Sequence, residues 1–433
     1  MVNYKKGLVL GATAAVLTTI AVTGAGLRLS RSFAYLEDNP KKLVDEVWQV
    51  INDTYVDGTF NQIDWLAVRQ KYVGDSKSYD SNEEAYKAIR EMLEQLGDPY
   101  TRFMNPEEFK NMQIDTSGEL TGVGIQLTKD EETKELVVVS PIEDTPAFEA
   151  GILSKDVITK IDGKTTVGME VEDAVKLIRG KPGSKVTLTI RRTDQEFNYP
   201  IIRARIELHP VKARIEDTPS GKIGYIRLTQ FSAHAGEEMR DAIREAEASK
   251  VNGYILDLRS NPGGLLYASV EIARMWLDEG KIVSTVSRSG EVEAQRATNR
   301  ALTDKPLVIL VDGGSASASE ILSGALQDNK RGILVGTKTF GKGLVQSVRR
   351  LGDGSSGLAV TIAKYLTPSG RDINKNGIEP DIVVELSEDD RKALQQAREK
   401  IGDFGDPQFD KAFEVLKQEI AKSGGTNARN TVR

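Results

Sequence analysis

The chain has no cysteine among its 433 residues and only two histidines, His209 and His234. Disulfide bonds, thiolate metal sites and cysteine-dependent catalysis are therefore excluded, although the absence of cysteine does not identify a compartment. A histidine-rich metal site is excluded as well, and a Ser-His-Asp triad would have to use one of the two histidines. We accordingly expect neither a metal nor another cofactor.

An excess of basic residues is also missing, because the formal net charge is -6. This balance gives no support to a general nucleic-acid-binding surface, and we expect no nucleic-acid partner. The length is sufficient for roughly two to four domains and for a sizeable core.

The N-terminus has the pattern of a targeting segment. Lys5 and Lys6 precede an uncharged run, residues 7–27, and a small-x-small pattern follows at residues 32–34. This pattern predicts an exported protein with a signal peptide or a membrane anchor in residues 1–35. An uncleaved segment would contact the membrane, because as a helix it spans about 30 Å.

Four regions of different character follow. Residues 36–116 have helical periodicity. Residues 117–205 contain short strands, turns and one helix, as in one compact module. Residues 206–390 alternate strands with helices, which is typical of an α/β core. Residues 391–433 form a charged helical tail whose polar end we expect to be disordered.

Within these regions the periodicity predicts individual elements. A helix is expected over residues 42–56, and a second one begins with a capping box from Ser81 to Glu84. In the α/β core the expected strands are 222–231, 253–259, 281–287 and 305–312, and the expected helices are 235–250, 265–280 and 317–328.

Residues 335–343, VGTKTFGKG, are one residue short of the phosphate-binding loop of a nucleotide hydrolase. Gly343 stands where that loop has the Ser or Thr that holds Mg²⁺, and residues 344–351 have the alternation of a strand rather than a helix. A nucleotide site is therefore not favoured. The plain alternative is a glycine-rich hairpin loop in which Lys342 is solvated.

Two loops rich in small residues follow predicted strands. In GGSASASE, residues 313–320, a serine can be held exposed beside free backbone N–H groups. Ser315, Ser317 and Ser319 compete for that position, and the alternative is that they cap the following helix. In DLRSNPGG, residues 257–264, the backbone N–H groups can approach an oxyanion, and the alternative is an ordinary turn.

These motifs resemble those of the C-terminal processing peptidases. The segments that carry the resemblance are GGSASASEILSGALQD, VGTKTFGKGLVQ, DLRSNPGG and PSGRDINKNGIEPD, and it extends from about Val44 to Asp381. It implies a secreted serine peptidase with a Ser-Lys active site and an inserted PDZ domain. The segment EVWQVINDTYVDGTFNQIDW is further similar to the cyanobacterial and chloroplast branch, some of whose members trim the C-terminus of the photosystem II reaction-centre precursor.

The implied fold is α/β and α+β multidomain. It consists of a helical N-terminal region (36–116), a PDZ domain (117–205), a ClpP/crotonase-like α/β serine protease core (206–390) and a helical C-terminal extension (391–433). The implied location is the periplasm or the thylakoid lumen.

The resemblance also implies roles for individual residues. Ser317 would be the nucleophile, Lys342 the general base, and Gln346 the residue that orients the lysine. The oxyanion donors would be the backbone N–H groups of Ala318 and Gly263, with Gly264 as the near alternative, and Asp328 would support the loop.

A lysine accepts a proton from serine only when it is neutral, so burial has to lower the pKa of Lys342 by several units from about 10.4. Carboxylates should be scarce around it, and none occurs between Lys330 and Arg350. Four extended residues would separate Lys342 from Gln346 by about 13 Å. We therefore expect a bend in the strand, supplied by Gly343.

The PDZ resemblance implies that a substrate tail adds as a strand and that its terminal carboxylate rests on loop N–H groups. The residues expected to bind the tail are Gly122, Val123 and Gly124 in the loop, Ile125 and Leu127 on the strand, and Val175 or Ile178 on the helix. The alternative is that these apolar residues are domain core. Arg179, at the end of the helix, is a candidate for coupling tail binding to the protease core.

The leading hypothesis is therefore an exported endopeptidase whose partners are proteins captured by their C-terminal tails. The rival is a non-catalytic PDZ adaptor or chaperone with a protease-like fold. A third interpretation is a Ser-His hydrolase that uses His209 or His234, both of which have the sequence context of surface positions. No oligomeric state is indicated.

Overall fold

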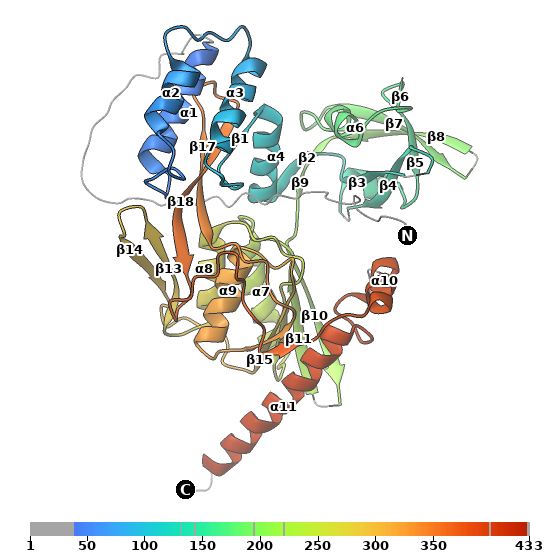
Figure 1. Ribbon diagram of the computed structural model, residues 1–433. Coiled ribbons are helices and arrows are strands. Elements are labelled where there is room, and N and C mark those ends of the chain that lie inside the picture. Colours follow the sequence, from blue (N-terminus) through green and yellow to red (C-terminus); the bar gives the residue numbers. More distant parts are fainter. Residues whose placement is uncertain are drawn as a thin grey trace, which may run out of the picture. The chain divides into compact units, whose positions relative to one another are not determined.

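The computed structural model describes residues 39–430 except for 131, 143, 194, 220, 398 and 399, and Figure 1 shows its helices and strands. The targeting segment predicted in residues 1–35 lies outside the described residues. Among those that are described, no helix has both the length and the apolar character required to cross a bilayer. The chain divides into two compact units, one made of residues 118–208 and one made of the remainder.

The larger unit begins with a helical region whose apolar side chains form their own core. The expected helix at 42–56 is α1 (Pro40–Thr54). The expected helix start at Ser81 is confirmed, because its hydroxyl accepts a hydrogen bond from the Glu84 N–H at 3.2 Å. The remaining elements of the region are α2 (Trp65–Val73), α3 (Asn82–Glu94), β1 (Arg102–Met104) and α4 (Pro106–Ser117).

A six-stranded sheet forms the centre of the same unit, in the order β10-β11-β12-β15-β16-β19. From β11 to β19 all neighbouring strands are parallel, as expected for an α/β core. The strands are β10 (Val211–Thr218), β11 (Gly221–Leu228), β12 (Tyr254–Asp257), β15 (Leu307–Val311), β16 (Ile333–Gly336) and β19 (Ile382–Val383).

Helices cover both faces of this sheet, which explains why its strands are almost continuously apolar. One face packs against α7 (Ala235–Ala248), α8 (Leu266–Trp276) and α9 (Ala318–Asp328). On the other face, Phe409 and Leu416 of α11 (Pro407–Asn430) pack with Ile255 and Leu310.

A second sheet joins the helical region to the α/β core. Its order is β1-β18-β13-β14, and β17 also pairs with β18. Phe103 of β1 lies opposite Leu358 of β18, so segments from opposite ends of the chain are neighbours (Figure 1). The other strands are β13 (Lys281–Ser287), β14 (Val292–Arg296), β17 (Leu344–Arg350) and β18 (Gly357–Leu366).

The smaller unit is a mostly antiparallel β structure with two short helices and its own apolar core. Its main sheet has the order β3-β4-β5-β7-β8, with β6 beside β5, and β2 pairs separately with β9. The elements are β2 (Glu119–Gly122), β3 (Ile125–Lys129), β4 (Leu136–Pro141), α5 (Pro146–Glu149), β5 (Val157–Ile161), β6 (Lys164–Thr165), α6 (Val171–Ile178), β7 (Lys185–Arg192), β8 (Gln195–Ile202) and β9 (Ala204–Glu207).

The C-terminal tail is helical, as expected, with α10 (Glu388–Gln396) followed by α11. Its end differs from the expectation of disorder, because α11 continues through Gly424 and Gly425 to Asn430. Extending an existing helix requires no new nucleus, so two glycines do not end it.

Candidate active site

The turn between β15 and α9 holds Ser317 in an unusual backbone conformation. Its φ is 56° and its ψ is -111°, a region that residues with a side chain rarely occupy. The hydroxyl groups of the two competing serines are engaged in hydrogen bonds to backbone carbonyl groups. The Ser315 hydroxyl donates to the Leu258 carbonyl at 2.8 Å, and the Ser319 hydroxyl donates to the Asn261 carbonyl at 2.9 Å. The middle serine is therefore the one on the strained turn, at the start of the helix.

The loop after β12 lies directly against this turn. Gly263 has a φ of 101°, and a Cβ there would lie only 3.0 Å from the Ala318 nitrogen. Ala318 is the first residue of α9, so its N–H has no acceptor within the helix. The Gly263 N–H donates to the Asn261 Oδ1 at 2.9 Å, so an oxyanion would have to replace that bond, whereas Gly264 is closed off on one side by the Phe231 carbonyl.

One buried carboxylate joins the serine turn to the loop that carries Lys342. The Glu320 Oε2 accepts from the N–H of Ser317 and from the N–H of Lys342, both at 2.8 Å. The Glu320 Oε1 accepts from the Gly341 N–H at 2.7 Å and from the Thr339 hydroxyl at 2.6 Å. The side chain is fully buried, and this burial raises the pKa of Glu320 against the lowering effect of its donors.

Tyr365 of β18 joins the same two segments through their carbonyl groups. Its hydroxyl lies 3.2 Å from the Ser317 carbonyl oxygen and also contacts the Lys342 carbonyl oxygen. Ser317 and Lys342 are thus tied together at both their N–H and their C=O groups, although they lie in different elements.

Lys342 has the buried environment that its expected role requires. The residue is 6% exposed, and its Nζ lies 4.8 Å from the centroid of the Tyr100 ring. Burial, helped by the positive charge of Arg102, lowers the pKa of Lys342 to about 8. The expectation of few carboxylates nearby was wrong: Asp98 and Glu320 both act to raise this pKa, and burial outweighs them.

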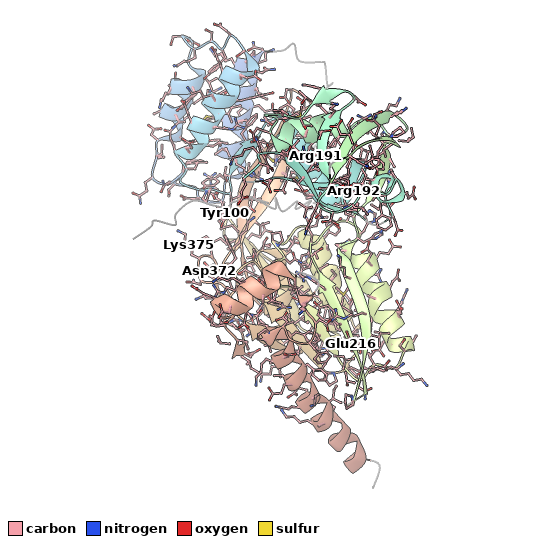
Figure 2. The ribbon with its side chains drawn as sticks, turned by 90° about the vertical axis from the view of Figure 1, so that its right-hand side faces the viewer. Tyr100, Arg191, Arg192, Glu216, Asp372 and Lys375 are labelled. Carbon is pink, nitrogen blue, oxygen red and sulfur yellow. The ribbon has the colours of Figure 1, made fainter. Side chains whose placement is uncertain are left out.

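One wall of this lysine site is formed by a segment that the sequence motifs did not indicate. Asp98, Tyr100 and Arg102 belong to GDPYTRFM, residues 97–104, between α3 and the end of β1. Figure 2 labels Tyr100 below the N-terminal helices. No local pattern indicates this role, because the segment reaches Lys342 only through the pairing of β1 with β18.

Gln346 lies on the strand predicted after Lys342, and the pairing of that strand is irregular beside it. The register of β17 on β18 shifts between Val345 and Gln346, so that both side chains are buried. The extra residue at this shift is Ile362 of β18, because Val345 lies opposite Ala363 and Gln346 lies opposite Thr361. The bend expected at Gly343 stays a prediction. Gly343 is required for another reason, since a Cβ would lie 2.6 Å from the Asn374 nitrogen.

Asp328 lies at the opposite end of α9 from Ser317, roughly 16 Å along the helix. Its Oδ2 accepts from the Ser369 N–H at 2.9 Å, and its Oδ1 pairs with Arg371. Hydrogen bonds from Thr367 and Ser369, together with Arg371, lower the pKa of Asp328 although burial opposes them. These contacts hold the turn after β18.

The residues expected to bind a peptide tail separate into two groups. Val123 and Ile178 are 1% and 6% exposed and belong to the core of the smaller unit. Ile125, Leu127 and Val175 are half-buried, the first two on β3 and the last on α6, which packs beside β3.

The loop between β2 and β3 has a backbone conformation that lets another chain approach closely. Gly124 has a φ of 85°, and a Cβ there would collide with Thr145, so only glycine fits. The Arg179 side chain lies beside Gly122, with its Cγ 3.8 Å from the position of a Cβ. Arg179 is therefore next to the expected carboxylate-binding loop.

Both histidines lie beside α7. The His209 Nδ1 lies 2.8 Å from the Glu238 Oε1 in an exposed pair, and His234 is the half-buried residue that precedes α7. Within the described ranges, no group of three or more His, Asp or Glu side chains is arranged to hold a metal ion.

Comparison with known families agrees with these two units. Residues 222–384 match the family described as Peptidase family S41, and residues 137–192 match the PDZ domain.

Several relatives are similar over most of their length. The carboxyl-terminal-processing protease of Synechocystis sp. is 47% identical over 82% of this chain and 82% of that protein. The chloroplastic carboxyl-terminal-processing peptidase 2 of Arabidopsis thaliana is 42% identical over 78% of this chain and 67% of its own length. The solved structure of a photosystem II D1 C-terminal processing protease is 35% identical, has a TM-score of 0.56, and is matched over 86% of this chain and 99% of that one.

The hydrogen bonds of Glu320 generate a prediction about stability. In Glu320→Gln an amide nitrogen replaces one acceptor oxygen, so buried N–H or O–H donors lose their partner. We expect the free energy of unfolding to fall by at least about 2 kcal/mol in urea titrations.

Glu237→Gln is the matched control, because Glu237 is also the third residue of its helix but is exposed. Its free energy of unfolding should stay within about 0.5 kcal/mol of the wild type. Equal effects of the two substitutions would contradict the bridging role of Glu320.

Proposed function

Because the chain belongs to the carboxyl-terminal-processing proteases of peptidase family S41, which are serine peptidases, we propose that it cleaves substrate tails with Ser317 as nucleophile and Lys342 as general base. Membership in this family supports a protease over a non-catalytic adaptor. The observation that carries the residue assignment is the single Glu320 oxygen that accepts from the N–H groups of both Ser317 and Lys342.

In the first half of the reaction, the neutral Lys342 Nζ takes the proton from the Ser317 Oγ as Oγ attacks the scissile carbonyl carbon. The resulting oxyanion is stabilised by the Ala318 N–H and by the N–H of Gly263 or Gly264. Lys342 then gives the proton to the nitrogen of the leaving fragment. The C–N bond breaks, the C-terminal fragment leaves, and Ser317 carries the acyl group.

In the second half, a water molecule attacks the acyl-enzyme and Lys342 accepts its proton. The ester bond to Ser317 breaks, and the proton passes from Lys342 back to the serine oxygen. Gln346 orients Lys342 through both steps, and Asp328 supports the turn after β18 rather than the chemistry.

We assign substrate capture to the PDZ unit. A C-terminal tail adds as a strand beside β3, its carboxylate rests on the N–H groups of residues 122–124, and its last side chain enters the space between β3 and α6. The half-buried Ile125, Leu127 and Val175 support this assignment.

The substrate class that we propose is exported proteins with accessible C-terminal tails, in the periplasm or the thylakoid lumen. The photosystem II D1 precursor is the leading candidate, because the solved relative at 35% identity is named for processing that protein. The predicted N-terminal segment would bring the enzyme to the membrane.

Substitution of the two central residues tests the mechanism. We expect both Ser317→Ala and Lys342→Ala to lose cleavage of a tail-containing peptide by at least about a hundredfold in kcat, because acid-base transfer and nucleophilic attack both fail. Cleavage is followed by mass spectrometry of the two fragments.

Lys338→Ala is the control for the lysine, since Lys338 lies four positions earlier, is exposed and pairs with Glu379. It should cleave at the wild-type rate. Full activity in Lys342→Ala, or loss of activity in Ser319→Ala with retention in Ser317→Ala, would overturn the assignment.

The low pKa of Lys342 predicts the pH dependence. Only the neutral amine accepts the serine proton, and its fraction rises with pH until the pKa of about 8 is passed. We therefore expect kcat/KM to rise about tenfold per pH unit below this value and to level off above it.

Arg102→Met should move that inflection to higher pH, because removing a positive charge makes protonation of Lys342 easier. Arg90→Met is the control, since Arg90 pairs with Glu108 and is not among the groups that shift the Lys342 pKa. An inflection that stays in place in Arg102→Met would contradict the charge effect.

Tail capture predicts that the substrate carboxylate contributes to KM. Replacing the free C-terminus of a peptide by a carboxamide should raise KM about tenfold with little change in kcat, because the loop N–H groups lose an anionic acceptor. Leu127→Asn should reduce this difference between acid and amide, whereas Val139→Asn on the exposed part of β4 should preserve it. Equal KM values for the acid and the amide in the wild type would contradict the assignment of substrate capture to the PDZ unit.

A further inference from the structure

Thr361 links Gln346 to the N-terminal helical region. It lies on β18 directly opposite Gln346, where the register of β17 shifts, and its Oγ1 is 3.5 Å from the Gln346 Nε2. The same hydroxyl donates to the Asp98 Oδ2 at 2.6 Å. Thr361 and Gln346 are 0% and 2% exposed, so water does not compete for these contacts.

The Asp98 carboxylate gathers donors from several segments. Its Oδ2 also accepts from the Thr101 hydroxyl at 2.7 Å, and its Oδ1 accepts from the Tyr100 N–H at 2.9 Å. The Tyr55 hydroxyl is a further partner. Thr101 in turn accepts from the Thr361 N–H at 3.0 Å, so the backbone of β18 is held as well as its side chain.

The chemistry of these groups sets the direction of the chain of hydrogen bonds. An ionised carboxylate only accepts, and a threonine hydroxyl has a single proton. Because that proton goes to Asp98, the Thr361 oxygen presents lone pairs to Gln346. The amide nitrogen of Gln346 is attracted there and its carbonyl oxygen is repelled, so Oε1 is turned away from Thr361.

We propose that Asp98 and Thr361 are positioning residues for the catalytic lysine: they fix the orientation of the Gln346 amide so that its carbonyl oxygen can accept a hydrogen bond from the Lys342 Nζ. This inference rests on the proposed function of Lys342 and Gln346. Neither Asp98 nor Thr361 is assigned a contact with the reacting atoms.

Asp98 also acts on Lys342 through its charge. The charged groups that affect Lys342 are Arg102 at the start of β1, Asp98 before it and Glu320 on α9, and the Tyr100 ring lies against the ammonium group. Asp98 raises the pKa of Lys342, so its neutralisation lowers it. A substitution of Asp98 therefore changes orientation and charge together, whereas a substitution of Thr361 changes orientation alone.

The test compares Thr361→Val, which has nearly the same shape without the hydroxyl, with Thr361→Ser, which keeps the hydroxyl and loses a methyl group. We expect Thr361→Val to lower kcat about ten- to a hundredfold with KM little changed, and Thr361→Ser to recover most of that loss. A purely structural role gives the opposite order or equal losses, and that result would overturn the proposal.

Asp98→Asn gives an independent readout. We expect kcat to fall. The inflection of the kcat/KM profile should move to lower pH, because a negative charge near the lysine is removed. The control is Asp353→Asn at the far end of the β17–β18 hairpin, where Asp353 also accepts from a helical-region residue, the Tyr86 hydroxyl at 3.3 Å. It should lower stability without moving the inflection.

The Gln346→Ala background separates the possible outcomes. If Thr361 acts through Gln346, Thr361→Val causes no further loss of kcat in this background, whereas multiplied losses overturn the proposal. Full activity in Lys342→Ala would instead remove the proposed function itself. An inactive Lys342→Ala together with a fully active Thr361→Val would leave the peptidase assignment standing and reject only the positioning role.

Discussion

The candidate site depends on one buried carboxylate. Burying an ionised group costs several kcal/mol unless donors compensate it, and Glu320 is compensated by four of them from two segments, the serine turn and the loop of residues 339–342. In return it holds the strained backbone of Ser317 and the loop of Lys342 at a common oxygen. Tyr365 repeats the connection on the carbonyl side. The proposed nucleophile and base lie on separate elements and therefore share one rigid support.

Opposing effects set the pKa of Lys342, rather than the absence of charged neighbours. Burial and Arg102 favour the neutral amine, while Asp98 and Glu320 favour the ammonium ion, and the balance leaves a pKa of about 8. A site without carboxylates would push this value lower and weaken the base, because basicity falls with the pKa. The two carboxylates serve a second purpose as hydrogen-bond acceptors, one for the loop of Lys342 and one for Thr361 opposite Gln346.

Much of the fold could be predicted because it is encoded locally. Helix and strand periods, the cap at Ser81 and the alternation of the core need only neighbouring residues, and the motifs around Ser317 and Lys342 are continuous in the sequence. The roles of Asp98, Thr361 and Tyr365 could not be predicted, since their contacts depend on tertiary structure. Asp98 and Thr361 are 263 residues apart in the sequence, and Tyr365 reaches Ser317 across 48 residues. Glu320 belongs to the serine motif, but a glutamate in the first turn of a helix is usually exposed. Only its burial in the structure shows that it connects Ser317 with Lys342. The register shift beside Gln346 was not predicted, because a bulge has no signature in an apolar strand.

The second sheet affects when the residues around Lys342 can come together during synthesis of the chain. The walls of the lysine site come from residues near 100 and from β18 near 361–365, with the nucleophile between them in the chain order. A nascent polypeptide that has emerged only as far as Ser317 lacks Lys342, and one that has emerged as far as Lys342 still lacks Thr361 and Tyr365. The arrangement around Lys342 can therefore form only after most of the sequence has been synthesised.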